Sequence, residues 1–129
     1  MERLLNIDRR IIFAFIFVGV AVPLLIDFSF PIKPTEPVQR VYDEFERVAS
    51  EDDPVVLLAF SYGASTVPEM QPMSLAILRH AFSRDIKVVA ICLWPEAPGL
   101  AQDALDQVAG EYGKEYGTDY AFLGYKPGL

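Results

Sequence analysis

Residues with catalytic or metal-binding chemistry are scarce in this chain of 129 residues, which has one cysteine, one histidine and one tryptophan. A single cysteine excludes an internal disulfide and a cysteine-rich metal site, so any metal would depend on carboxylates alone. The sequence has no G-x-x-x-x-G-K-[ST] loop, and no G-x-G-x-x-G motif follows a candidate strand. We therefore predict no phosphate loop, no metal site, no cofactor and no catalytic residue.

Positive charge is also scarce after residue 33. Residues 34–129 carry seven basic and fifteen acidic side chains, a net charge of 7 − 15 = −8. A domain this acidic repels phosphate backbones and anionic lipid surfaces. Nucleic acid is therefore excluded as an expected partner.

One long apolar run stands out near the N-terminus. Ile11–Ile26 contains no charged residue and follows Arg9 and Arg10. Sixteen helical residues reach only about 24 Å, against about 30 Å of bilayer hydrocarbon, so apolar flanking residues must extend the segment. We predict a cytoplasmic N-terminus over residues 1–10 and a transmembrane anchor over residues 11–30, which has the lipid bilayer as its partner.

A cleavable signal peptide is the alternative for this run, because it shares the basic start and the apolar centre. The residues after the run, Asp27–Pro31, lack the small-x-small pattern of a cleavage site, which favours an uncleaved anchor. Arg3, Arg9 and Arg10 precede the run and only Lys33 follows it nearby. The positive-inside rule then places the protein in the cell membrane as a single-pass protein, with its C-terminal domain outside the cytoplasm.

Helical spacing and proline content divide the residues after the run. Three prolines predict an extended spacer over residues 31–37. Apolar residues recur at helical spacing over residues 37–50. A crossover helix is expected to begin at Pro72, and another helix over residues 100–112 is expected to end at Gly113 in the left-handed conformation.

Three apolar segments are predicted to be strands: Val55–Phe60, Lys87–Leu93 and Tyr120–Leu123. The first two are continuously apolar, as in parallel strands covered on both faces. The order α-β-α-β-α-β over residues 38–129 predicts a small three-layer, Rossmann-like α/β domain with a parallel sheet and helices on its faces.

Three strands are few for an open parallel sheet, and one apolar strand would lie at an exposed edge. We expect the chain to be either a fragment of a longer protein or a domain completed by another molecule. A membrane-protein partner or a second copy, forming a homo-oligomer, would then cover that edge.

The apolar run, together with Leu57–Gly63, Ile91–Pro95 and Phe122–Gly128, resembles the N-terminal part of an uncharacterised family of prokaryotic membrane-anchored α/β proteins. More chain usually follows in that family, which supports the fragment interpretation. The family has no established activity, so the resemblance implies no mechanism.

Ligands of parallel α/β sheets bind beyond the C-terminal ends of the strands, near a topological switch point. The loops after the three strands should therefore share one rim with hydroxyl, carboxylate, ammonium and aromatic groups. The candidate ligand-binding residues are Ser61, Tyr62, Gly63, Ser65, Trp94, Glu96, Tyr125 and Lys126.

The same residue types also suit ordinary turns, with Gly63 at a positive φ, serine and threonine as helix caps, and Trp94 as a core residue. Thr66–Glu69 matches a capping box. Cys92 lies within an apolar strand and is expected to be a buried packing residue.

Two classes of function remain open at this point. The first is a membrane-anchored, extracytoplasmic binding or scaffolding domain whose ligand or partner is unknown. The second is a hydrolase-like enzyme that uses Ser61 or Ser65, with part of its site supplied by missing chain or a partner. Ala59 replaces the first glycine of a G-x-S-x-G nucleophile elbow. His80, the only histidine, falls within a helix and is expected to be a surface or packing residue, so the first class is favoured.

Overall fold

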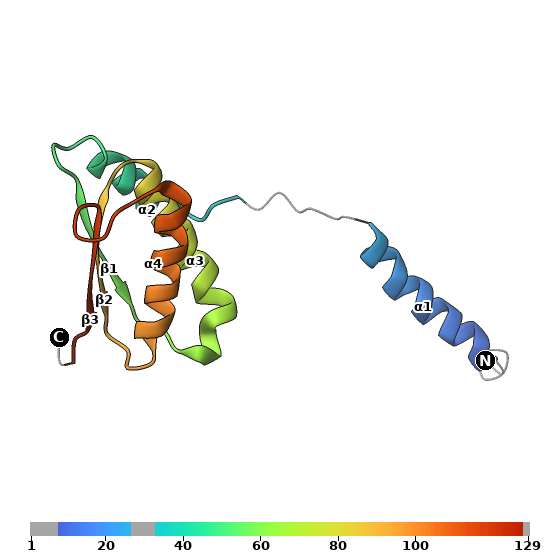
Figure 1. Cartoon of the computed structure of the whole chain (residues 1–129). Helices are drawn as coiled ribbons and strands as arrows, with labels where there is room; N and C mark the ends of the chain where they lie inside the picture. The colour runs from blue at the N-terminus through green and yellow to red at the C-terminus, as the bar shows by residue number, and fades with distance from the viewer. Residues whose placement is uncertain (1–7, 27–32, 128–129) are drawn as a thin grey trace. The chain divides into compact units, whose positions relative to one another are not determined.

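A computed structural model describes residues 8–26 and 33–127, and the chain divides into two compact units, Met1–Pro34 and Thr35–Leu129 (Figure 1). The first unit contains helix α1, Arg9–Leu25. Asp8 caps this helix by accepting a hydrogen bond from the backbone N–H of Arg10 at 3.0 Å. The predicted anchor flanks within residues 1–7 and 27–32 lie outside the described residues.

The predicted transmembrane helix over residues 11–30 is not supported by the structure. Within the described ranges, no helix combines the length and the hydropathy expected of a membrane-crossing helix. The observed helix α1 has 17 residues, which corresponds to about 26 Å, and it begins with two arginines.

The second unit is an α/β unit with a three-stranded parallel sheet in the order β1-β2-β3. The predicted α-β-α-β-α-β order is confirmed. The elements are α2 (Glu36–Val48), β1 (Val55–Phe60), the 3-10 turn η2 (Ala64–Thr66), α3 (Val67–Ser83), β2 (Lys87–Cys92), α4 (Ala97–Tyr112) and β3 (Tyr120–Tyr125).

Prolines account for two wrong helix boundaries. Helix α3 begins at Val67, not at Pro72, because Pro68 lies in its first turn, where a missing N–H costs no hydrogen bond. Similarly, α2 begins at Glu36 and includes Pro37, so the predicted end of the spacer at residue 37 is wrong. The predicted left-handed end of α4 is confirmed, since Gly113 has φ 62° and its N–H donates to the carbonyl of Ala109.

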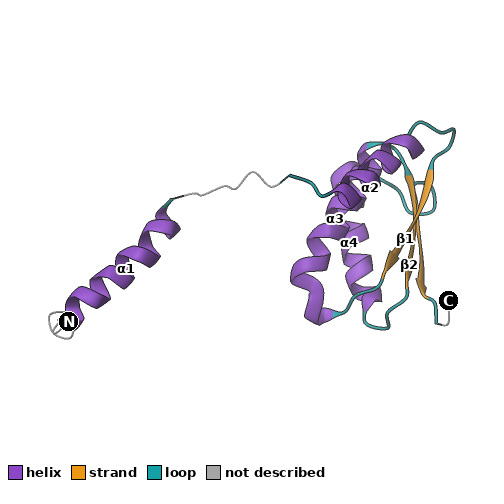
Figure 2. Cartoon of the chain, turned by 180° about the vertical axis from the view of Figure 1, so that it is seen from behind, coloured by secondary structure: helices purple, strands orange, loops and turns teal. Residues whose placement is uncertain are grey.

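The sheet is covered on one face, so the predicted three-layer arrangement is wrong. Helices α3 and α4 lie on the same side of the strands in both views (Figures 1 and 2). Two right-handed crossovers that advance in one direction, from β1 to β2 to β3, place both helices on the same face. A third layer requires the strand order to reverse, and this order does not.

The two faces of the sheet differ sharply in exposure. We call the covered side the inner face; it contains Phe60, Val88, Ala90, Cys92 and Tyr120, all buried. We call the other side the outer face; by strand alternation and register it contains Val55, Leu57, Val89, Ala121 and Leu123. Leu57 is 65% exposed. The expectation that β1 is covered on both faces is therefore wrong.

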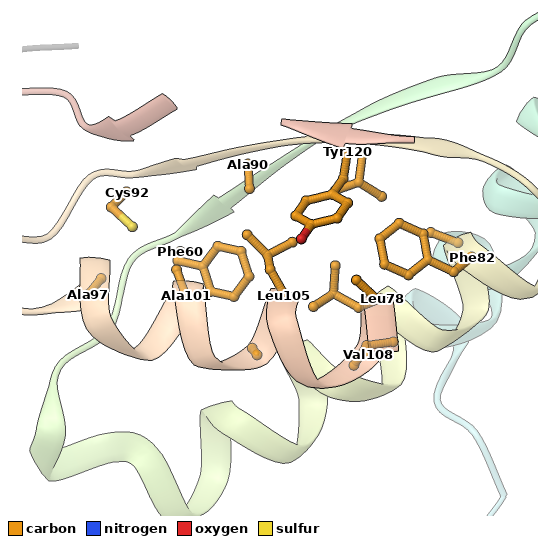
Figure 3. Close-up of a cluster of buried hydrophobic side chains, with 14 of the residues drawn as sticks. Phe60, Leu78, Phe82, Ala90, Cys92, Ala97, Ala101, Leu105, Val108 and Tyr120 are labelled. Atoms are coloured by element: carbon orange, nitrogen blue, oxygen red, sulfur yellow. The ribbon is translucent and has the colours of Figure 1, made fainter. Parts of the chain in front are cut away.

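The core lies between the inner face and the two helices. Phe60 and Tyr120 from the sheet point toward Leu105 of α4, and Leu78 and Phe82 of α3 close the same cluster (Figure 3). Burial raises the pKa of Tyr120, with Asp106 adding to the shift. Cys92 is fully buried as predicted, and burial raises the pKa of its thiol, which keeps it protonated and unreactive.

Candidate functional site

A pocket of about 270 Å³ lies where β1 and β2 end. Its walls come from the loop after β1, from Ser65 and Thr66 of η2, and from the loop between β2 and α4. Neighbouring parallel strands bring these two loops together, because their carboxyl ends meet at the same edge of the sheet. The lining residues are Ser61, Tyr62, Gly63, Ser65, Thr66, Trp94 and Glu96.

Six of the eight candidate ligand-binding residues line this pocket, but Tyr125 and Lys126 do not. Strand β3 continues to Tyr125, and the N–H of Lys126 donates to the carbonyl of Cys92 at 2.9 Å. The third strand is therefore longer than predicted, and no separate loop begins at Gly124. The sheet also has no topological switch point, because its strand order does not reverse.

Gly63 allows a close approach of the Glu96 side chain. A Cβ at position 63 would overlap the Glu96 Oε2 atom and lie 3.2 Å from the Trp94 Nε1 atom. The backbone of Gly63 is extended, with φ −118°, so the predicted positive φ is wrong. The glycine instead leaves space for the carboxylate, whose Oε2 accepts a hydrogen bond from the N–H of Ala64 at 3.3 Å.

Trp94 is 52% exposed, so the alternative that it fills the core is wrong. Its indole lines the pocket, and its Nε1 atom lies close to Gly63. Aromatic side chains that combine an apolar body with a polar N–H are common in recognition sites. Trp94 is therefore placed to contact a ligand.

Tyr62 forms a wall of the pocket. It is only 5% exposed, and its hydroxyl donates to Gln71 Oε1 at 2.5 Å. Gln71 in turn donates to the carbonyl of Leu100 at 3.4 Å, which links α3 to α4. The sequence did not predict this role of Gln71, since nothing in the pattern of α3 distinguishes it from a solvent-facing residue.

The hydroxyls of the pocket have different roles. Thr66 Oγ1 donates to the carbonyl of Gly63 at 3.1 Å and forms no cap hydrogen bond with α3, so the predicted capping box is wrong. Ser61 and Ser65 are exposed. Their hydroxyls are therefore accessible to a ligand.

His80 is distant from both serines. It lies fourteen positions after Thr66, which corresponds to about 21 Å along the helix. Its Nε2 lies 2.9 Å from Glu46 Oε1, and its ring stacks on Tyr42 and Phe45 of α2. The predicted packing role of His80 is confirmed, and it cannot act as a general base at Ser61 or Ser65.

Hydrogen bonding to His80, and then to Arg84, lowers the pKa of Glu46. These contacts join α2 to α3 away from the pocket. In the part of the chain that the structure describes, no group of three or more histidine, cysteine, aspartate or glutamate residues could hold a metal ion.

The chain matches no protein-family model, no curated protein and no solved structure. The class of the second unit follows from its fold: a two-layer α/β unit with a parallel sheet and a polar pocket at the carboxyl edge. The resemblance to a family of membrane-anchored proteins stays a prediction.

Proposed function

We propose that this chain is a membrane-anchored, extracytoplasmic binding module whose pocket at the carboxyl edge of β1 and β2 takes a small polar ligand. The observation that carries the proposal is the pocket itself, which brings exposed hydroxyls, a carboxylate and an indole together from two loops. Its volume of about 270 Å³ is close to the lower end of small-molecule sites.

The side chains of the pocket favour binding over catalysis. A serine nucleophile needs a hydrogen-bonded base that is itself oriented by a third group. His80 packs against α2, and the pocket has one charged group, Glu96. We therefore expect that a fluorophosphonate probe does not label the protein. Labelling that Ser61→Ala or Ser65→Ala abolishes would overturn this choice.

The proposed location in the membrane rests on α1 and the residues around it. All side chains of α1 except that of Ala21 are exposed, and they include large apolar groups such as Phe15 and Leu25. Exposed apolar surface of this extent marks a segment that binds protein or lipid. We propose that the bilayer takes up this segment together with its flanks, with the arginines on the cytoplasmic side.

A scaffolding role is part of the same proposal. The outer face exposes Val55, Leu57 and Leu123. Parallel sheets are normally covered on both faces. A membrane-protein partner or a second copy would supply that cover, along with cover for the free edge of the sheet.

The binding role is tested by screening small polar solutes against the protein with the fluorescence of Trp94, the only tryptophan. A ligand should change the emission and raise the melting temperature. In Trp94→Phe the emission signal disappears, while backbone NMR shifts of Ser61–Thr66 still report ligand entry. A set of anionic, cationic and neutral solutes that shifts none of these signals would contradict the proposal.

The proposed membrane location and topology are tested with the full chain expressed in a bacterium. Protease added to intact spheroplasts should digest the second unit, and carbonate washing should leave the protein in the membrane fraction. Protection of the second unit in intact spheroplasts with digestion after lysis would reverse the topology. Release by carbonate would exclude an integral anchor.

A further inference from the structure

We infer that the ligand of this pocket carries a primary ammonium group, which pairs with Glu96 and lies beside the indole of Trp94. The inference rests on the proposed function, because it names the chemistry of the ligand for the same pocket. It follows from the charge of the pocket, from the partners of its carboxylate and from its size.

Glu96 is the only charged residue that lines the pocket. Elsewhere in the unit many carboxylates have a cationic partner, such as Glu111 with Arg79 at 2.7 Å and Asp85 with Lys114 at 2.6 Å. Among the described residues, Glu96 has no such partner. A carboxylate that faces a pocket without a cation is available to a ligand that brings one.

The geometry disfavours an anionic ligand. The amino end of η2 could attract an anion, but the N–H of Ala64 donates to Glu96 Oε2. An incoming phosphate or carboxylate would have to displace Glu96 or lie against its charge. The net charge of −8 over residues 34–129 adds to this repulsion.

The other groups of the pocket suit an ammonium. The three N–H bonds of an ammonium need acceptors, and the pocket offers the carboxylate and the exposed hydroxyls of Ser61 and Ser65. An indole face attracts a nearby cation more strongly than other aromatic rings do. Trp94 lines the same pocket as Glu96 and is 52% exposed, so its indole is accessible to a cationic ligand that pairs with Glu96.

The size of the pocket points to a single alkylammonium group. A volume of about 270 Å³ holds a short aliphatic chain and its ammonium. Such a group comes either from a free small amine or from the lysine side chain of a peptide. The shared chemistry is the same, and two probes separate the sources.

The experiment titrates the full chain in detergent with n-pentylamine and with Nα-acetyl-lysine amide at low ionic strength, using the emission of Trp94. We expect saturable binding that weakens at least tenfold in Glu96→Gln, a variant whose amide oxygen can still accept from the N–H of Ala64. Asp103→Asn removes an exposed carboxylate of α4 outside the pocket and is the matched control, which should bind as the unmodified protein does. Nα,Nε-diacetyl-lysine amide, which lacks the charge, should not bind.

The outcomes separate this inference from the proposed function. Tighter binding of n-pentylamine indicates a free amine, and tighter binding of the lysine derivative indicates a peptide. If both probes fail while a neutral or anionic solute shifts Ser61–Thr66, the inference is wrong and the binding module stands. Equal weakening of binding in Glu96→Gln and Asp103→Asn would show that binding depends only on the net charge of the protein. That result would overturn the inference. Binding of inorganic phosphate by Glu96→Gln alone would also overturn it, because Glu96 would then be a structural cap.

Discussion

The two faces of the sheet belong to the same apolar strands, yet one face is buried and the other is exposed. Phe60 and Leu57 both belong to β1, and their exposed fractions are 1% and 65%. Their side chains differ little in hydrophobicity, so composition does not explain the difference. The direction in which the crossovers advance does, because it places both α3 and α4 on one face.

The largest expected effect comes from placing a negative charge on each face in turn and comparing the loss of stability. Ala90→Asp buries a carboxylate among Phe60, Leu105 and Tyr120, and it should destabilise the protein by more than about 4 kcal/mol and abolish cooperative unfolding in urea. Leu57→Asp should remain folded, with a loss below about 1 kcal/mol. Equal loss in the two variants would mean that another molecule or segment covers the outer face.

A second test removes apolar volume from the same strand. Phe60→Ala should cost about 3–5 kcal/mol, because Phe60 is fully buried and its removal leaves a cavity. Leu57→Ala should cost less than about 1 kcal/mol, since its side chain is mostly in solvent. Urea unfolding followed by circular dichroism measures both. A loss above about 2 kcal/mol for Leu57→Ala would contradict the open outer face.

A third test compares two glycines at and near the end of α4, one of the helices that cover the inner face. Gly113→Ala should destabilise by about 1 kcal/mol, because φ 62° strains any residue with a Cβ. Gly110→Ala should stabilise by about 0.5–1 kcal/mol, because Gly110 lies within α4 and a Cβ there meets no atom within 4 Å. Thermal unfolding measures both changes. Stabilisation by Gly113→Ala, as is expected of Gly110→Ala, would show that the end of α4 is not held in the left-handed conformation.

The smallest effect concerns the ion pair that joins the two helices of that layer. Arg79 donates to both oxygens of Glu111, and this contact, with a smaller part from Gln107, lowers the pKa of Glu111 to about 2 from an ordinary value of 4.5. A lowered folded-state pKa stabilises the folded state above pH 4.5, and that stability is lost as the pH falls from 4.5 to 2. The urea midpoint of Glu111→Gln should therefore lie below that of the unmodified protein at pH 6 and converge with it near pH 2.

Asp103→Asn is the control for this prediction. Its side chain is exposed and forms no ion pair among the described residues, so its urea midpoint should follow the unmodified protein throughout. The Glu111 side chain is 36% exposed, so salt should reduce the difference at pH 6. A difference that persists unchanged at pH 2 would assign the effect to packing.

Local periodicity predicted most of the elements, because apolar spacing records local conformation. The residues of β1 and the end of α4 at Gly113 agree with their predictions. The start of α3 was missed, since Pro68 fits a turn as well as a first helical turn. The number of layers was missed for another reason: a continuous apolar strand shows that burial would be favourable, but topology decides which face receives a helix.

The part of the candidate site that strand pairing brings together could be predicted from the sequence. The loops after β1 and β2 converge because the strands are parallel neighbours, and they carry six of the predicted residues. Lys126 was placed wrongly, because the residues around Gly124 resemble a turn but extend β3. The contact of Glu96 with Ala64 across 32 residues leaves no local pattern that could reveal it.

The irregular pairing of β3 makes the two edges of the sheet chemically unequal. Between Phe122 and Tyr125 it has one residue more than the facing segment of β2, and Gly124 there has φ 72°. Such a bulge breaks the regular row of backbone donors and acceptors that an incoming strand needs. Strand β1 has no bulge, proline or charged residue within Val55–Phe60. Strand addition, whether by a partner or during aggregation, should therefore begin at β1.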